Sequence, residues 1–196
     1  MADDYFDKSN QHEVYLQRFA TYLVNTHTQP NLKAAYKAAR LILLDAENIT
    51  SNTQLNKITA AIAREIKPNT ELMWNEVTGE LNDMAVAESV FQAKLFKDVM
   101  AVNLAVPVDK KILGYINSSL MTLQSGQRVN SGVFAEYVAQ NTSSLVNTYK
   151  NQIRAGYAER ETVNQITKRL RNVTNGMLAN EAEALARTGM LSLIHI

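Results

Sequence analysis

A long stripe of apolar residues between residues 74 and 102 constrains the fold more than any other feature of this sequence. Its positions are separated by alternating steps of three and four residues over about eight turns, a heptad-like spacing that predicts one long helix packed against another helix. The stripe comprises Trp74, Val77, Leu81, Met84, Glu88, Phe91, Leu95, Val99 and Val102. Buried carboxylates are normally paired, so we expect Glu88 either at the rim or beside a Lys or Arg of another helix.

Helices are also predicted before this stripe. Residues 11–27 have helical spacing, and the stretch "TQPN" around Pro30 should break the chain, because proline cannot donate a backbone hydrogen bond. Helix resumes near residue 32. A short helix, "QLNKITAAIAREI", should end before Pro68, and Thr70 should cap the long helix, which is expected to run to about Ala105.

After the long helix, the stretch "AVPVD" interrupts the helical spacing, which then resumes. Asp109 is a candidate cap for a short helix, "KKILGYI". The following stretch is rich in Ser, Asn and Gln with a turn at Gly126, and it is predicted to be a loop with a few extended residues at Leu120 to Leu123.

Three further helices are predicted in the remainder of the chain. Ser131 should cap the first, and Gly156 should break it. The second ends at Gly176, and the third begins near Met177 and runs through Leu185. The predicted fold class is therefore all-α, with a helical N-terminal region at residues 1–68 and a second unit, which contains the long helix, at residues 69–190.

The composition is that of an ordinary folded protein. The 196 residues are 46% hydrophobic and 20% charged, with a net charge of +1, which argues against disorder and against a global field for nucleic acid or membrane. Cysteine is absent, which excludes disulfides and thiolate metal sites. Residues 1–15 are acidic, and no run approaches the roughly 18 apolar residues of a membrane span, so neither a signal peptide nor a membrane partner is expected.

The sequence contains no arrangement typical of an active site. A phosphate-binding glycine loop is missing, and the histidines, His12, His27 and His195, are far apart in sequence. Carboxylates such as Asp45 and Glu47 are two residues apart, which places them on different faces of a helix. We predict no catalytic residue, cofactor, metal site or small-molecule substrate, and we do not expect residues 1–190 to form an enzyme.

Basic residues cluster in one stretch of the chain, between Thr148 and Val173. Six cations and two carboxylates, Glu159 and Glu161, give a local net charge of six minus two, or +4. The cations are Lys150, Arg154, Arg160, Lys168, Arg169 and Arg171. They form either a contact surface for DNA or an acidic partner, or a solvated helix face, which is what charge runs usually are.

The order of these elements resembles the minor head proteins of tailed bacteriophages, the head morphogenesis proteins of the Mu type. The resemblance covers roughly residues 71–190: a long helix, a loop with "SGQ", then "IRAGYAERETVNQITKRLR" and finally "EAEALART". The matching positions are Glu88, Ile153, Gly156, Thr162, Ile166, Leu170, Ala182, Leu185, Arg187 and Thr188. The chain departs from the family pattern at Glu159 to Glu161, where a second Gly is usual, and at Gly189, where Glu is usual.

The resemblance implies a structural component of a phage head that acts in head assembly near the portal and in DNA delivery. Its partners would be the portal and other head proteins, with non-specific contact to DNA. Its location would be the virion, assembled in the cytoplasm of the bacterial host. In the family the helix with the Arg–Thr pair opens the second half of the domain, so residues 69–190 would be a truncated head-morphogenesis domain.

The last six residues, Leu191 to Ile196, are expected to be foreign to the protein. They are what CTG-TCT-CTT-ATA-CAC-ATC encodes, a string that matches a transposase end sequence used to fragment DNA for sequencing. We interpret residues 191–196 as derived from an adapter, with a genuine apolar C-terminus as the alternative.

Two other functions remain open from the sequence. One is a nucleic-acid-binding helical regulator, for which "RAGYAERETVNQITKRL" is an imperfect helix-turn-helix candidate. The other is the non-catalytic N-terminal part of a larger enzyme.

Overall fold

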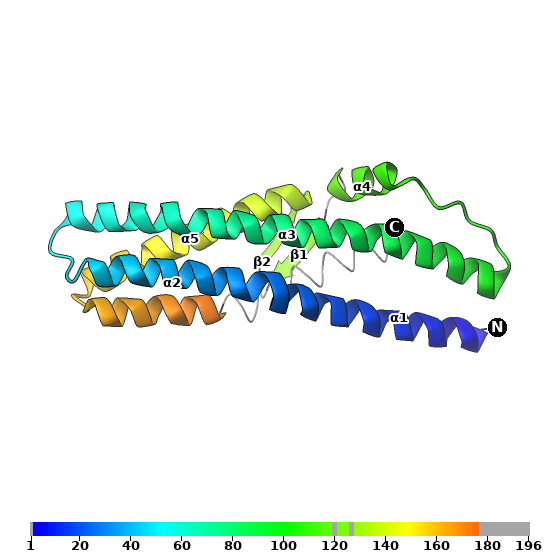
Figure 1. Cartoon of the computed structure of the whole chain (residues 1–196), viewed down its shortest axis with the longest axis horizontal. Coiled ribbons are helices and arrows are strands. Elements are labelled where there is room, and N and C mark those ends of the chain that lie inside the picture. Colours follow the sequence, from blue (N-terminus) through cyan, green and yellow to red (C-terminus); the bar gives the residue numbers. More distant parts are fainter. Residues whose placement is uncertain (1, 119–120, 126–127, 177–196) are drawn as a thin grey trace.

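The computed structural model describes residues 2–118, 121–125 and 128–176. These residues form helices aligned along one long axis, together with a small β-hairpin (Figure 1). The predicted all-α fold class is confirmed. Several predicted features lie outside the described residues, namely Leu120, Gly126, the helix from Met177, Arg187, Thr188, His195 and the 191–196 tail.

The first part of the chain is one nearly continuous helical rod. It consists of α1 (Ala2–Leu23), the π-helix η1 (Val24–Thr28) and α2 (Gln29–Asp45). The predicted break at Pro30 is wrong, because Pro30 lies in the first turn of α2, where a missing N–H costs little. The wider π-turn ahead of it keeps the backbone helical, with the Gln29 N–H donating to the Val24 carbonyl.

The second rod is α3 (Asn52–Met100), a helix of 49 residues that runs antiparallel to the first (Figure 1). The Ser51 hydroxyl caps it by accepting a hydrogen bond from the Gln54 N–H at 3.2 Å. The predicted end of a helix before Pro68 is wrong, because α3 continues through this residue. Packing overrides the proline: Ile66 and Thr70 are fully buried beside it, and the Thr70 hydroxyl donates to the Ile66 carbonyl instead of capping a new helix.

The C-terminal end of α3 comes earlier than the sequence suggested. The helix ends at Met100, and Ala101 takes a left-handed conformation with φ of 57°. Residues 101–108 have no regular secondary structure, so Val102, the last predicted member of the apolar stripe, is 44% exposed and does not belong to it.

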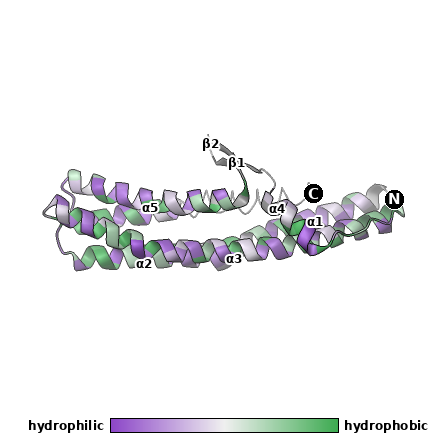
Figure 2. Ribbon diagram, turned by 90° about the horizontal axis from the view of Figure 1, so that it is seen from above, coloured by the Kyte–Doolittle hydropathy of each residue, from purple (hydrophilic) through white to green (hydrophobic). Residues whose placement is uncertain are grey.

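The rest of the described chain returns along α3. It comprises α4 (Asp109–Ser118), an antiparallel hairpin of β1 (Met121–Ser125) and β2 (Arg128–Gly132), α5 (Phe134–Ala158) and a helix at residues 163–176. The hairpin projects from the helices (Figure 2). Extended residues were expected at Leu120 to Leu123, but the second strand was not expected. That strand contains Ser131, the predicted cap of α5. The cap of α5 is Val133, whose N–H donates to Glu136 Oε2 at 3.1 Å.

Two regions with different packing result. In the bundle, α2, residues 52–75 of α3, α5 and the 163–176 helix lie side by side around a shared core (Figures 1 and 2). In the arm, α1 packs against residues 76–100 of α3. The largest fully buried apolar side chains are almost all in the bundle, and they are Leu23, Leu43, Ile62, Ile66, Tyr149, Ile153, Ile166 and Leu170.

Candidate interaction sites

A buried histidine–carboxylate contact joins the two helices of the arm. Glu88 is only 2% exposed, and its carboxylate contacts His12 Nε2 from α1 and accepts a hydrogen bond from Gln92 Nε2 at 2.7 Å. The His12 ring also stacks on Phe91, with ring centroids 3.6 Å apart. Glu88 was expected either at the rim or beside a Lys or Arg of another helix; instead it is buried, and its partner on the other helix is a histidine.

A second histidine contact lies nearer the bundle, where the π-turn η1 faces α3. His27 Nδ1 is 3.2 Å from Glu76 Oε2, and His27 Nε2 is 3.5 Å from Glu80 Oε1 without hydrogen-bond geometry. The Tyr22 hydroxyl donates to Glu80 at 3.3 Å. Burial, followed by the Glu80 charge, raises the pKa of Tyr22. Sequence spacing could not show that His12 and His27 face one helix, because their partners are far away along the chain.

Aromatic side chains form an exposed flank along the arm. His12, Tyr15, Phe19 and Tyr22 follow one another on α1 in steps of three, four and three, which places them on one side of the helix. Tyr15 is 52% and Tyr22 is 43% exposed, whereas Phe19 is partly buried against the core. We call Tyr15, Phe19 and Tyr22 the aromatic flank.

The residues of the predicted basic cluster lie on α5, on the 163–176 helix and in the turn between them. Lys150 and Arg154 share a face of α5, and Lys168 and Arg171 share a face of the 163–176 helix, because members of each pair are four and three residues apart. Arg154, Lys168 and Arg171 are exposed, and none of them makes an ion pair within the part of the chain that the structure describes.

Arg169 differs from the other cations because it is held by carboxylates. Its Nε and Nη2 donate to both oxygens of Glu161 at 2.6 and 2.7 Å, and Nη2 also contacts Glu159. The hydrogen bonds to Glu161 are the main cause that raises the pKa of Arg169. This clamp secures the turn at residues 159–162, so the Arg169 guanidinium is already engaged and is not available in the way the sequence suggested.

Gly156 permits the close contact between α5 and the next helix. It lies in the last turn of α5, which continues to Ala158 and has Glu159 as its C-cap, so Gly156 does not itself break the helix as predicted. A Cβ at this position would lie 2.6 Å from Ile166 Cγ1 and 2.8 Å from Glu161 Oε2, so any larger residue would push the helices apart. Two of the positions that carry the family resemblance, Gly156 and Ile166, therefore meet in a packing contact.

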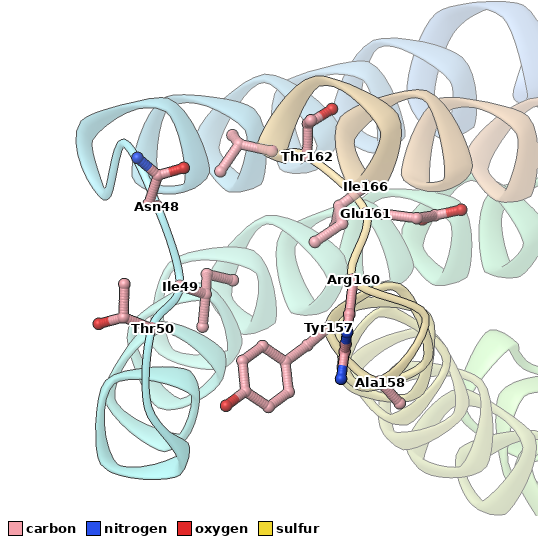
Figure 3. Close-up of a pocket in the computed structure, with 10 residues that line it drawn as sticks. Asn48, Ile49, Thr50, Tyr157, Ala158, Arg160, Glu161, Thr162 and Ile166 are labelled. Atoms are coloured by element: carbon pink, nitrogen blue, oxygen red, sulfur yellow. The ribbon is translucent and has the colours of Figure 1, made fainter.

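A pocket of about 570 Å³ lies at the end of the bundle, where the turn at residues 46–51 faces the turn at residues 159–162 (Figure 3). Ile49 from the first turn and Tyr157 and Ile166 from the second side face the same space. The residues that line it are Asn48, Ile49, Thr50, Tyr157, Ala158, Arg160, Glu161, Thr162, Val163 and Ile166.

Comparisons of the chain with protein-family models, with curated proteins and with solved structures found no match. Among the residues that the structure describes, no group of three or more His, Asp or Glu side chains could hold a metal ion. No helix in the described ranges is long and apolar enough to cross a membrane. The candidate sites are the aromatic flank, the exposed cations and the pocket, and each is defined by the structure of this chain alone.

Proposed function

We propose that this protein is a structural, non-catalytic component of a tailed-phage head that acts in head assembly near the portal and in DNA delivery. In this proposal it is assembled in the cytoplasm of the bacterial host, becomes part of the virion, and binds the portal or another head protein through its arm. The aromatic flank is the observation that carries the proposal.

The aromatic flank has the properties of a protein-binding surface. Tyrosine and phenylalanine contribute large contact areas at low entropic cost and are enriched where binding energy is concentrated. The spacing of Tyr15, Phe19 and Tyr22 repeats that of a helix-packing seam, although the buried side of α1 is already formed by Leu16, Ala20 and Leu23. A partner helix laid along this flank would turn the two-helix arm into a three-helix unit.

The resemblance to head morphogenesis proteins supports the identity of the partner. Its matching positions include Glu88 in the arm, which is buried, and Gly156 and Ile166 in the bundle, which are in contact. These positions explain how such a chain holds its shape, which is what a structural component of an assembly requires. No step of this proposal needs a reaction.

Co-expression with the portal protein of the phage that carries this gene tests the proposal. We expect a complex that survives size-exclusion chromatography and that the double variant Tyr15→Ala, Tyr22→Ala weakens at least tenfold. The double variant Leu41→Ala, Leu44→Ala is the matched control, because it removes two exposed apolar side chains from the bundle instead. A portal that fails to bind, or binds both variants equally well, would contradict the proposal.

We also propose that Lys168 and Arg171 contact DNA without reading its sequence. They are exposed, unpaired among the described residues and on one helix face. Binding to duplex DNA should be weak and should fall steeply with salt, with a log–log slope of about 0.9 for each phosphate contacted. Fluorescence anisotropy should show that Lys168→Glu, Arg171→Glu abolishes binding, whereas Lys110→Glu, Lys111→Glu on α4 does not.

The regulator alternative gains less support from the structure. A helix-turn-helix joins two helices at about 90–120°. Here α5 and the 163–176 helix both run along the long axis of the molecule and share its core (Figure 1). If the anisotropy measurement instead showed tight binding to one sequence, the regulator would replace the head component as the preferred function.

A further inference from the structure

The pocket at the end of the bundle has a mixed lining, which among the described residues includes four apolar side chains and one cation, Arg160. The apolar side chains are Ile49 from the turn at residues 46–51, Tyr157 from α5, and Val163 and Ile166 from the 163–176 helix. A volume of about 570 Å³ lies within the range of small-ligand sites, about 300–1,000 Å³. The pocket is therefore large enough for an aliphatic or aromatic group with a polar end.

Most polar groups around the pocket already have partners. The Thr162 hydroxyl donates to Gln165 Oε1 at 2.8 Å, and the Thr50 hydroxyl donates to Gln54 Oε1 at 3.1 Å. Glu161 is neutralised by Arg169. Arg160 is the exception among the charged lining residues, since within the described ranges its guanidinium makes no ion pair.

Arg160 also occupies an unfavourable backbone conformation. Its φ is 56°, in the left-handed region where glycine is strongly preferred and where a residue with a Cβ is strained. Glu47 and Ala101, which also follow helix ends, share this conformation. The Glu161 N–H donates to the Gly156 carbonyl at 2.9 Å, so the left-handed residue ends α5 and brings the Arg160 side chain to the pocket. Figure 3 places Arg160 on the α5 side of the pocket, beside Tyr157.

We propose that this pocket binds a carboxylate attached to an apolar group. The carboxylate pairs with the Arg160 guanidinium, whose planar fork of donors matches two carboxylate oxygens, and the apolar group lies between Ile49, Tyr157 and Ile166. This chemistry occurs in a free small acid and in the C-terminal residue of a polypeptide. The site lies at the opposite end of the molecule from the arm and does not depend on the proposed head function.

NMR titration of the full-length, ¹⁵N-labelled protein tests the proposal with three probes. N-acetyl-leucine carries the proposed chemistry, N-acetyl-leucinamide has the same shape without the charge, and an acetylated peptide ending in leucine represents a polypeptide C-terminus. We expect N-acetyl-leucine to shift the amides of Ile49, Tyr157 and Ile166 with a Kd on the order of millimolar. The amide should bind at least about tenfold more weakly, because it lacks a charge-assisted bond.

Two variants separate binding from folding. Arg160→Gly should keep the fold, because glycine suits the left-handed backbone, and should weaken N-acetyl-leucine binding at least about tenfold. Lys168→Gln, which removes an exposed cation outside the pocket, should bind as the wild type does. A peptide at least tenfold tighter than N-acetyl-leucine would identify a polypeptide as the ligand, and equal affinities would identify a small acid. Equal binding of acid and amide, an unaffected Arg160→Gly variant, or no shifts at all would overturn the proposal.

Discussion

The bundle and the arm differ in how many helical segments bury their apolar side chains. In the bundle, four helical segments enclose Ile62, Ile66, Ile153 and other side chains that are fully removed from solvent. In the arm, two helices share one seam, and large apolar side chains such as Phe6 and Val90 lie outside it and stay exposed, as Leu41 and Leu72 do in the bundle. Cooperative burial holds the bundle, whereas the arm depends on individual contacts between α1 and α3.

A polar contact is buried within the otherwise apolar seam of the arm. Glu88 lies on the apolar stripe of α3, and its partner His12 lies on α1. A hydrogen-bonded pair of this kind is specific in register but adds little net stability, because both groups lose water when they are buried. The difference teaches that the arm is built to hold a defined alignment of two helices while it keeps a surface open, and the bundle is built for stability.

The largest expected effect comes from a cavity in the bundle. Ile153→Ala should lower the free energy of unfolding by about 3–5 kcal/mol, because Ile153 is fully buried among four segments that cannot collapse around it. Leu95→Ala, at a buried position in the arm, should cost about 2 kcal/mol, because two helices relax more easily. Urea unfolding followed by circular dichroism measures both values. Equal costs would show that the arm is as rigidly packed as the bundle.

Removing either histidine should lower the free energy of unfolding, and the loss should be larger where the glutamate partner is more deeply buried. His12→Ala leaves Glu88 buried with one partner fewer and removes the stacking on Phe91, so it should cost about 2–4 kcal/mol. His27→Ala should cost less than about 1 kcal/mol, because Glu76 and Glu80 are each about a third exposed, at 38% and 35%, and can be solvated. Thermal unfolding of both variants in one buffer gives the comparison, which a larger loss for His27→Ala would reverse.

The bundle should also weaken in alkali through one tyrosine. Burial raises the pKa of Tyr149 to about 12, against the opposing effect of its hydrogen bond with Thr174 at 2.5 Å. In the unfolded chain the phenol ionises near 10, so its contribution is complete below pH 10 and is lost as the pH rises to 12. Two pKa units correspond to roughly 2–3 kcal/mol. Denaturant titrations from pH 9 to 12 should show this loss in the wild type, and a Tyr149→Phe variant should lack it.

The sequence predicted the helices better than their ends. Apolar spacing depends on which side chains are buried, so the stripe from Trp74 to Val99 was found correctly. Pro30 and Pro68 were predicted to be breaks because local rules describe an isolated chain. Pro30 instead lies in the first turn of α2, where its missing N–H costs little, and at Pro68 packing outweighs the loss of one hydrogen bond. Tertiary context, which one sequence does not display, decided these boundaries.

The candidate sites show the same limit. The pairing of Glu88 could be anticipated from its place on an apolar stripe, but its partner His12 lies 76 residues away, and nothing local marks it. Arg169 was grouped with the free cations because net charge over a segment ignores which groups face each other; the clamp with Glu161 depends on the turn between two helices. The sequence has no glycine at Glu159 to Glu161, where the resembled family usually has one. Only the structure shows that Arg160 there has a left-handed backbone, the conformation that glycine adopts most easily.

The smallest expected effect concerns two threonines on one helix. Thr167 is buried, and its hydroxyl makes no hydrogen bond within the described residues, so Thr167→Val should stabilise the bundle by about 1 kcal/mol by removing an unsatisfied polar group of nearly the same shape. Thr174 is two turns further along and is also buried, but its hydroxyl forms hydrogen bonds with Tyr149 and the Leu170 carbonyl. Thr174→Val should therefore cost about 1 kcal/mol. Opposite signs in parallel urea titrations would show that the bundle is limited by polar satisfaction and not by volume. Equal losses in both variants would mean that Thr167 has a partner after all, and that the bundle, like the arm, depends on buried polar contacts.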